Sequence, residues 1–267
     1  MPNESIYVNA PLVEVIAEVH WQLIPLATMP GAGVDPYYDA TVDSLLSTLR
    51  QRGFRHLEKL IPTEVPREMV ANQPTHRFRK EAGKSPLYQF GPGVFTANVI
   101  PPYEGWTKFV PILRGGIDAL LRAYPLASET MKITHVHLRY VDAFTSRLGF
   151  ADVPQFFKDG LGVEVKFPEK FASMHKAKPT SCVLNYEIES TKPAGAVLQL
   201  VAGSGKSNEE DGVVMQLSLT SPLRNSKPQI DDLMAWFDEA HAVLKETFES
   251  LTTDDLKRRM GPKKELA

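Results

Sequence analysis

Polar residues that could do chemistry are concentrated on one face of two long stretches with alternating hydrophobicity. In residues 12–24 the polar positions carry two carboxylates and an imidazole, and in residues 133–144 they carry two imidazoles and a guanidinium. A period of two is typical of half-buried strands, so each polar set should project from one side of a sheet. The predicted ligand-binding candidates are Glu14, Glu18, His20, His135, His137 and Arg139, with Asn98 from a nearby hairpin.

If the two strands are neighbours near the sheet centre, these side chains share one surface. Carboxylates beside imidazoles could bind an anion or exchange protons with a substrate. His135 and His137 point the same way on a strand and could bind a metal, but the sequence indicates no third ligand. The simpler interpretation is a solvated sheet face with cross-strand ion pairs, and we favour it. No metal, cofactor or catalytic residue is therefore assigned.

A second motif, residues 203–207 (GSGKS), ends like a phosphate-binding loop. The full motif needs a glycine five residues before Gly205, where Leu200 stands, and a helix after the loop. Residues 208–212 instead lead into a strand, so we reject nucleotide binding. We expect a polar hairpin turn from Gly203 to Gly212.

Other reactive residue types have simpler explanations. Cys182 opens an apolar strand and should act as a small hydrophobic residue. His241 lies on the apolar stripe of the last long helix, where a core or interface histidine is expected. The sequence has no nucleophile elbow and no HExxH motif.

The elements that position the polar residues follow the order strand, helix, strands, long helix in residues 1–128. Residues 106–124 form the clearest helix of this half, although two adjacent glycines interrupt it. Gly116 lies on its apolar stripe, where close packing against another backbone is expected, whereas Gly115 has no such explanation. The predicted elements are strand 12–24, helix 37–52, irregular chain or an edge strand in 54–74, strand 76–80, hairpin 86–100 and helix 106–124.

Residues 129–267 repeat this order. The first strands and the long helices of the two halves are both offset by about 120 residues, which indicates internal duplication. We predict an α+β fold, in which two pseudo-repeats form one mostly antiparallel curved sheet with long helices on one face. The halves should form one compact unit. The elements are strand 133–144, helix 152–160, loop 163–180, strands 181–190, 195–202 and 213–221, helix 229–251, a short last helix and a frayed tail.

Composition narrows the class of protein. The chain has 267 residues, 43% of them hydrophobic and 23% charged, with a net charge of -2. These values are ordinary for a folded soluble protein and favour neither nucleic acid nor anionic membrane. The single cysteine excludes a disulfide within the chain, and there is no signal-peptide pattern or membrane-length apolar run. We expect a cytoplasmic protein without a membrane partner.

Basic residues are nevertheless clustered, and aromatic residues lie near some of them. Such a combination could bind nucleic acid, since basic charge follows the backbone and aromatic rings stack on bases. Solvated surface balanced by the 32 acidic residues is the interpretation we favour. The clusters are Arg50, Arg52, Arg55 and Lys59; Arg77, Arg79, Lys80 and Lys84; and Lys257, Arg258, Arg259, Lys263 and Lys264.

Five stretches together resemble a sporadically distributed bacterial protein family of unknown function, whose members have about this length. The stretches are residues 9–11 (NAP), 90–98 (FGPGVFTAN), 105–113 (GWTKFVPIL), 138–144 (LRYVDAF) and 236–256 (WFDEAHAVLKETFESLTTDDL). In that family the position of Asp142 is more often Asn. The resemblance implies no catalytic residue, and sporadic occurrence suggests a link to defence or to a toxin and its partner.

The function hypothesis is a non-enzymatic module that binds a protein or a small ligand through the open sheet face or under the helices. Two alternatives use the polar face of the two long strands. One is a hydrolase-like enzyme acting through His135, His137 and Arg139 with Glu18, and the other is a nucleic-acid-binding protein. The sequence leaves open whether the chain forms a homo-oligomer. In outline the fold should be similar to TATA-binding-protein-like or helix-grip folds.

Overall fold

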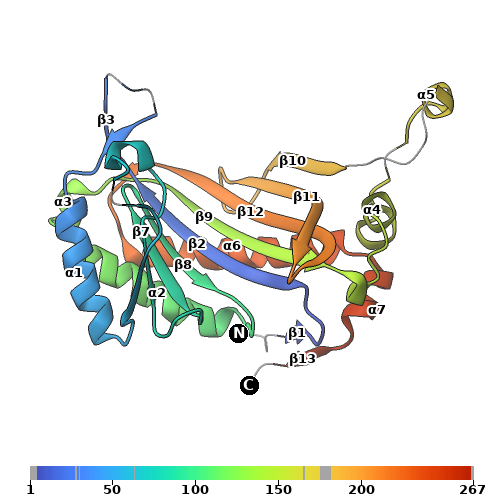
Figure 1. Cartoon of the computed structure of the whole chain (residues 1–267), viewed down its shortest axis with the longest axis horizontal. Coiled ribbons are helices and arrows are strands. Elements are labelled where there is room, and N and C mark those ends of the chain that lie inside the picture. The colour runs from blue at the N-terminus through green and yellow to red at the C-terminus, as the bar shows by residue number, and fades with distance from the viewer. Residues whose placement is uncertain are drawn as a thin grey trace.

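Strands β2 (Leu12–Trp21) and β9 (Ile133–Phe144) lie side by side at the centre of a nine-stranded sheet. This computed structural model describes residues 5–27, 29, 31–62, 64–164, 166–174 and 182–265. Neighbouring strands are antiparallel, in the order β10-β11-β12-β9-β2-β8-β7-β6-β5 (Figure 1). The remaining strands are β5 (His56–Lys59), β6 (His76–Arg79), β7 (Leu87–Gly91), β8 (Val94–Val99), β10 (Val183–Glu189), β11 (Val197–Ser207) and β12 (Glu210–Ser226).

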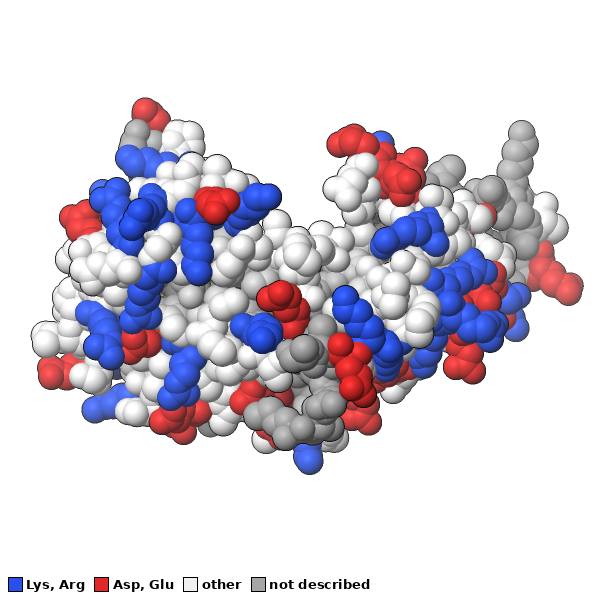
Figure 2. All heavy atoms as spheres, turned by 90° about the horizontal axis from the view of Figure 1, so that it is seen from below, with Lys and Arg blue, Asp and Glu red and all other residues white. Residues whose placement is uncertain are grey.

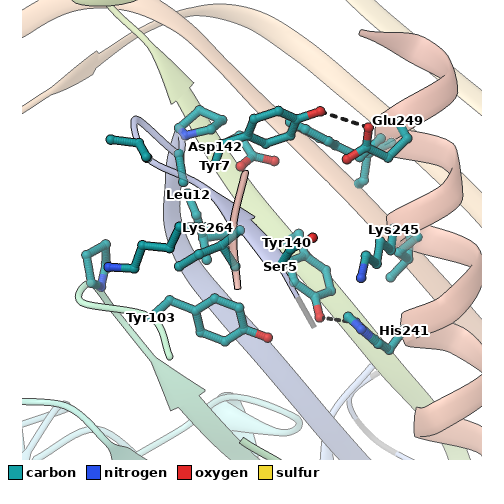
Figure 3. Close-up of a pocket in the computed structure, with 18 of the residues that line it drawn as sticks. Ser5, Tyr7, Leu12, Tyr103, Tyr140, Asp142, His241, Lys245, Glu249 and Lys264 are labelled. Carbon is teal, nitrogen blue, oxygen red and sulfur yellow. Dashed lines mark hydrogen bonds between the residues drawn. The ribbon is translucent and has the colours of Figure 1, made fainter. Parts of the chain in front are cut away.

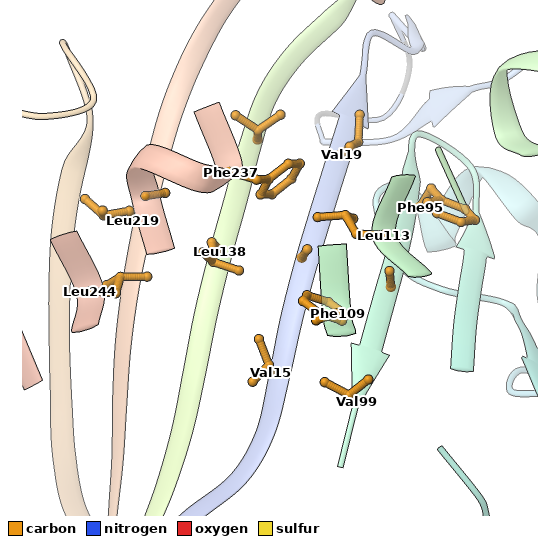
Figure 4. Close-up of a cluster of buried hydrophobic side chains, with 14 of the residues drawn as sticks. Val15, Val19, Phe95, Val99, Phe109, Leu113, Leu138, Leu219, Phe237 and Leu244 are labelled. Atoms are coloured by element: carbon orange, nitrogen blue, oxygen red, sulfur yellow. The ribbon is translucent and has the colours of Figure 1, made fainter. Parts of the chain in front are cut away.

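Two long helices, α2 (Trp106–Ala123) and α6 (Ile230–Leu251), cover one face of this sheet (Figure 1). The alternation in β2 and β9 sends their apolar residues toward the helices, and each fully buried apolar side chain contributes roughly 1.5–3 kcal/mol. The α+β class and the antiparallel sheet are therefore confirmed. The core between the sheet and the helices contains Val15, Val19, Phe95, Val99, Phe109, Leu113, Leu138, Leu219, Phe237 and Leu244 (Figure 4).

Smaller elements complete the chain. Helix α1 (Tyr38–Gln51) packs against α2, and α4 (Val153–Leu161) packs against α7 (Asp254–Met260). The others are α3 (Ala127–Thr130), α5 (Glu169–Met174), 3-10 turns at Arg67–Val70 and Ser146–Leu148, and two small sheets that pair β1 (Ser5–Tyr7) with β13 (Lys263–Glu265) and β3 (Ile24–Pro25) with β4 (Gly33–Val34).

The hairpin between β11 and β12 differs from the predicted polar turn. The strands continue through residues 203–207 and 210–212, and the reversal occurs at Asn208 and Glu209, both with positive φ. Positive φ at two central residues is typical of a tight two-residue hairpin turn. Glycine is needed inside the strands instead, because a Cβ on Gly205 would lie 2.4 Å from Val214 Cγ2. Residues 203–207 therefore lie in a strand, without the helix of a phosphate-binding loop.

Two further predictions were wrong. The predicted loop 163–180 contains helix α5, although residues 165 and 175–180 lie outside the described part. The predicted frayed tail contains β13, which pairs with β1 and brings the two chain ends together (Figure 1).

None of the helices in the described part combines the length and the apolar character that crossing a lipid bilayer requires.

The two adjacent glycines of α2 differ in the space around them, and only Gly116 is required by packing. A Cβ on Gly116 would lie 2.4 Å from Tyr88 Cε1 and 3.1 Å from Phe95 Cζ, so two aromatic rings occupy its space. The expectation of close packing is correct, but the neighbours are side chains rather than backbone. A Cβ on Gly115 would meet only Arg52 Nη1 and Tyr88 Oη, at 3.8 and 3.9 Å.

Candidate functional site

The two polar strand faces predicted from the sequence meet at the sheet centre. Cross-strand partners are His20 with His135 and Glu18 with His137, and Arg139 lies opposite Ile16. Because the residues between them point toward α2 and α6, these side chains occupy the opposite face, which we call the polar face. The Glu18 cluster is defined as Glu18, His20, His135, His137 and Arg139.

Glu18 is the centre of this cluster. Arg139 Nη2 donates to Glu18 Oε1 at 2.7 Å, and His20 Nε2 lies 2.9 Å from Glu18 Oε2. His137 Nδ1 lies further away, 3.9 Å from Glu18 Oε2. Only 12% of the Glu18 side chain is exposed, so these contacts form in a partly dehydrated environment. One carboxylate therefore holds together three side chains from two strands.

The environment keeps Glu18 ionised. Burial by itself raises the pKa of a carboxyl group, since it disfavours the charged form. The neighbouring imidazoles of His137 and His20 and the charge of Arg139 outweigh burial, and together they hold the pKa of Glu18 well below its usual range. At neutral pH Glu18 is a fixed negative charge rather than a group that exchanges protons.

His135 stacks on His20 and stays neutral. The two rings lie 4.0 Å apart between centroids, with 16° between their planes. Burial, together with the nearby imidazoles of His20 and His137, lowers the pKa of His135 to about 4. Desolvation and like charge both disfavour an imidazolium. His135 therefore contributes an uncharged ring to the polar face at neutral pH.

Glu14 and Asn98 form a second group on the same face. Asn98 Nδ2 donates to Glu14 Oε1 at 2.8 Å, and Thr96 Oγ1 donates to Asn98 Oδ1 at 2.5 Å. Asn98 and Thr96 are each only 2% exposed. Thr96 lies opposite Glu18 in the register, so the two groups adjoin. All seven predicted residues therefore lie on one face, in two neighbouring hydrogen-bonded groups.

Three polar atoms of the Glu18 cluster are buried without a hydrogen-bond partner among the described residues. They are Nδ1 of His20, Nε2 of His137 and Nε of Arg139. Buried polar atoms in proteins are nearly always paired, so such atoms need an explanation. Among the described residues no three His, Cys, Asp or Glu side chains are grouped as metal ligands would be. The HVH alternation therefore forms no metal-ligand set there.

Sequence reasoning missed a cavity on the helix side of the sheet, with a volume of ≈ 330 Å³. It lies between α6, one end of β2 and β9, the Pro-rich corner after β8, and the β1–β13 pair (Figure 3). Its lining is mainly apolar. The polar and charged lining residues are Ser5, Tyr7, Tyr103, Tyr140, Asp142, His241, Lys245, Glu249 and Lys264.

Hydrogen bonds fix several polar side chains of this cavity. Tyr7 Oη donates to Glu249 Oε2 at 2.9 Å, and Tyr140 Oη lies 2.7 Å from His241 Nδ1 (Figure 3). The His241 ring stacks on Trp106, with 4.4 Å between centroids. His241 is thus held within the protein, as the sequence predicted, but it also lines a cavity.

The position of Asp142 in the strand pattern could have indicated this cavity from the sequence. It occupies an inward position of β9, in line with Val136, Leu138 and Phe144, where an apolar residue is expected. Asp142 is 3% exposed, and burial raises its pKa to about 7. A carboxylate at a core position therefore indicates a special environment.

The basic clusters do not form one surface. The first two lie on or beside α1, β5 and β6, whereas the third lies on α7 and β13 at the other end of the sheet (Figure 1). Lys and Arg side chains are also interspersed with Asp and Glu on the face seen in Figure 2. Several are paired, including Arg52 with Asp118 and Arg77 with Glu58.

Comparisons of the chain with protein families, curated proteins and solved structures found no match. The resemblance to a sporadically distributed bacterial family therefore stays a prediction. The function has to be inferred from the geometry of the chain itself.

Proposed function

We propose that this chain is a non-enzymatic binding module, which takes a carboxylate or phosphate group of a ligand or partner on its polar face. The observation that carries the proposal is the set of three unpaired buried atoms, on His20, His137 and Arg139. Leaving a buried polar group unpaired costs about 1–3 kcal/mol. An oxyanion accepts hydrogen bonds from the Arg139 Nε–H and from an N–H at His137 Nε2, so one ligand group would remove two of these costs.

Binding is favoured over catalysis by the protonation states of the cluster. A general base works best when its pKa lies near the working pH. The pKa of Glu18 lies far below that range, and His135, with a pKa of about 4, is not an imidazolium at neutral pH and so cannot act as a general acid there. A hydrolase that uses these residues would need the pKa values of both groups to shift toward the working pH. A ligand-binding role needs only a fixed charge pattern, which this cluster supplies.

We also propose that the polar face is the inside of a curved sheet built by duplication. Outward from β2 the strands run β8, β7, β6, β5, and outward from β9 they run β12, β11, β10. Each half thus adds its later strands next to its own first strand, as a repeated unit would. The hollow in the outline of Figure 2 supports the curvature. An acidic segment of a partner, as in toxin–partner systems, would fit such a hollow.

Titration with inorganic phosphate and with acetate, followed by the imidazole NMR signals of the seven histidines, tests the proposal. We expect saturable shifts of the His20 and His137 signals at millimolar or lower concentration. Arg139→Met should abolish them, while Arg139→Lys keeps the charge beside Glu18 and should weaken them. Arg122→Met is the matched control, because Arg122 also pairs with a carboxylate but lies on α2.

Two results would overturn the proposal. One is the absence of saturable shifts in the wild type with either anion. The other is an equal response of the wild type and both Arg139 variants, because general ionic-strength effects do not depend on one guanidinium. Since Arg139→Lys protects the charge balance of Glu18, it keeps the test valid even if Arg139→Met unfolds.

A further inference from the structure

The cavity beside α6 has the size and character of a small-molecule site. Its ≈ 330 Å³ volume falls within the range of about 300–1,000 Å³ that such sites occupy. Apolar side chains make up most of the wall, and a few polar groups converge on it, as ligand sites require. The apolar lining residues are Ile6, Val8, Ala10, Pro11, Leu12, Pro101, Pro102, Leu217, Leu244 and Phe248.

Asp142 is a buried acidic side chain of the wall, and the described residues provide no hydrogen bond or ion pair for its carboxylate. It is 3% exposed and lies beside Leu12 and Met215 in the sheet. Ionising a carboxyl group in such a place is costly unless a partner pairs with it. The lysines that line the cavity, Lys245 and Lys264, are both exposed at its rim.

The other acidic group of the wall is already engaged. Glu249 accepts a hydrogen bond from Tyr7. It also forms an ion pair with Lys263, whose Nζ lies 2.8 Å from Glu249 Oε1. A cation that enters the cavity would therefore find Asp142, rather than Glu249, as the carboxylate without a partner. The surrounding apolar wall would accommodate the rest of a compact molecule.

We propose that this cavity is a second binding site, which takes a small primary amine with a compact apolar body. The ammonium group of the ligand would pair with the Asp142 carboxylate, and its apolar part would contact the wall formed by α6 and the β1–β13 pair. The site lies on the opposite side of the sheet from the Glu18 cluster, so it does not depend on anion binding there.

Protonation supports this choice of ligand. Burial raises the pKa of Asp142 to about 7, so the carboxyl group is partly protonated near neutrality in the free protein. An ammonium binds the ionised form, and binding should therefore tighten as the pH rises through 7. Other groups of the lining can also titrate, and a variant of Asp142 separates its contribution from theirs. They are Tyr7, Tyr103, Tyr140, His241, Lys245, Glu249 and Lys264.

Calorimetric titration of the whole chain with benzylamine, and with benzyl alcohol as its neutral analogue, tests the proposal. We expect the affinity for benzylamine to rise about tenfold between about pH 6 and pH 8.5, following the ionised fraction of Asp142. Asp142→Asn should weaken benzylamine binding at least about tenfold at the higher pH, with little effect on benzyl alcohol. Asp43→Asn, an exposed acid on α1, is the control.

A second variant keeps the test decisive if Asp142→Asn does not fold. Ala10→Phe adds a ring from a half-buried wall position, so it should abolish binding of both probes while the fold persists. The proposal is wrong if benzylamine does not bind, if benzyl alcohol binds as tightly as benzylamine, or if either Asp142→Asn or Ala10→Phe leaves benzylamine affinity unchanged.

Discussion

Arg139 reaches past its own cross-strand neighbour to bind Glu18. Arg139 lies opposite Ile16 in the register, but its Nη2 donates to Glu18 Oε1 at 2.7 Å. Ile16 has no side-chain acceptor, and His137, which lies directly opposite Glu18, stays 3.9 Å from the carboxylate. The strongest contact of the cluster is thus diagonal, a geometry that long side chains can span on a sheet.

Replacing Glu18 by Gln should destabilise the fold at neutral pH. The change leaves Arg139 and two imidazoles without their anionic partner, which costs roughly 1–3 kcal/mol. The pKa of Glu18 is lowered in the fold, so its contribution is present above the unfolded value of about 4.3 and disappears as the pH falls further. Urea unfolding at about pH 7 and pH 3 should therefore show a difference between variant and wild type that shrinks on acidification. Glu239→Gln, an exposed position on α6, should show neither effect.

His135 should remain neutral until about pH 4. Because folding lowers its pKa, the unfolded chain takes up the proton first, and stability falls as the pH drops from about 6.5 toward 4. His135→Phe keeps a ring beside His20 and should remove this part of the acid sensitivity. Imidazole NMR gives the titration directly, and a His135 midpoint near 6.5 would contradict the structure.

Asp142 should make the fold less stable as the pH rises. Its folded pKa of about 7 lies above the unfolded value of about 3.9, so stability is highest below about pH 4 and is lost up to about pH 7. Relative to the wild type, Asp142→Asn should therefore gain roughly 2–4 kcal/mol of unfolding free energy between about pH 4 and pH 8. Parallel pH profiles of the two proteins would show that the carboxyl group is not desolvated.

The adjacent glycines of α2 should respond in opposite directions to alanine. Gly116→Ala places a Cβ within 2.4 Å of Tyr88, which should cost about 1–3 kcal/mol through overpacking. Gly115→Ala has ordinary contacts at 3.8 Å and beyond, so helix propensity should stabilise the fold by about 0.5–1 kcal/mol. Thermal unfolding of the two variants gives the comparison, and equal effects would contradict the packing.

The sequence predicted the polar face better than it predicted the cavity. The bounds predicted for strand 133–144 match those of β9, and its alternation placed His135, His137 and Arg139 on one face; at Ile133 a register shift breaks the period and buries the side chain in the core. The sequence left open whether these two strands are neighbours; the structure pairs β2 with β9, and their register brings Glu18 opposite His137. Local periodicity was sufficient because each strand contributes its polar residues at regular spacing.

The cavity escaped prediction because its wall comes from segments that are far apart in the chain. Residues 5–12, 101–103, 140–142, 241–249 and 264 meet there only after the fold has formed. The pairing of β1 with β13 was also missed, since both strands are three residues long and too short to show a period. Glycines 203, 205 and 212 were misleading for another reason. They indicated a turn, whereas all three lie in strands, and close strand contacts require glycine at positions 205 and 212.

The central pairing of β2 with β9 also has a consequence for how the chain reaches its final shape. Glu18 and Arg139 are separated by 121 positions, so their contact closes a very long loop, and such closures are slow because chain entropy is lost before contacts form. During synthesis, the first half would emerge with one side of β2 unpaired. A fragment that ends before residue 133 would keep this open edge, which can pair with a second copy and lead to aggregation.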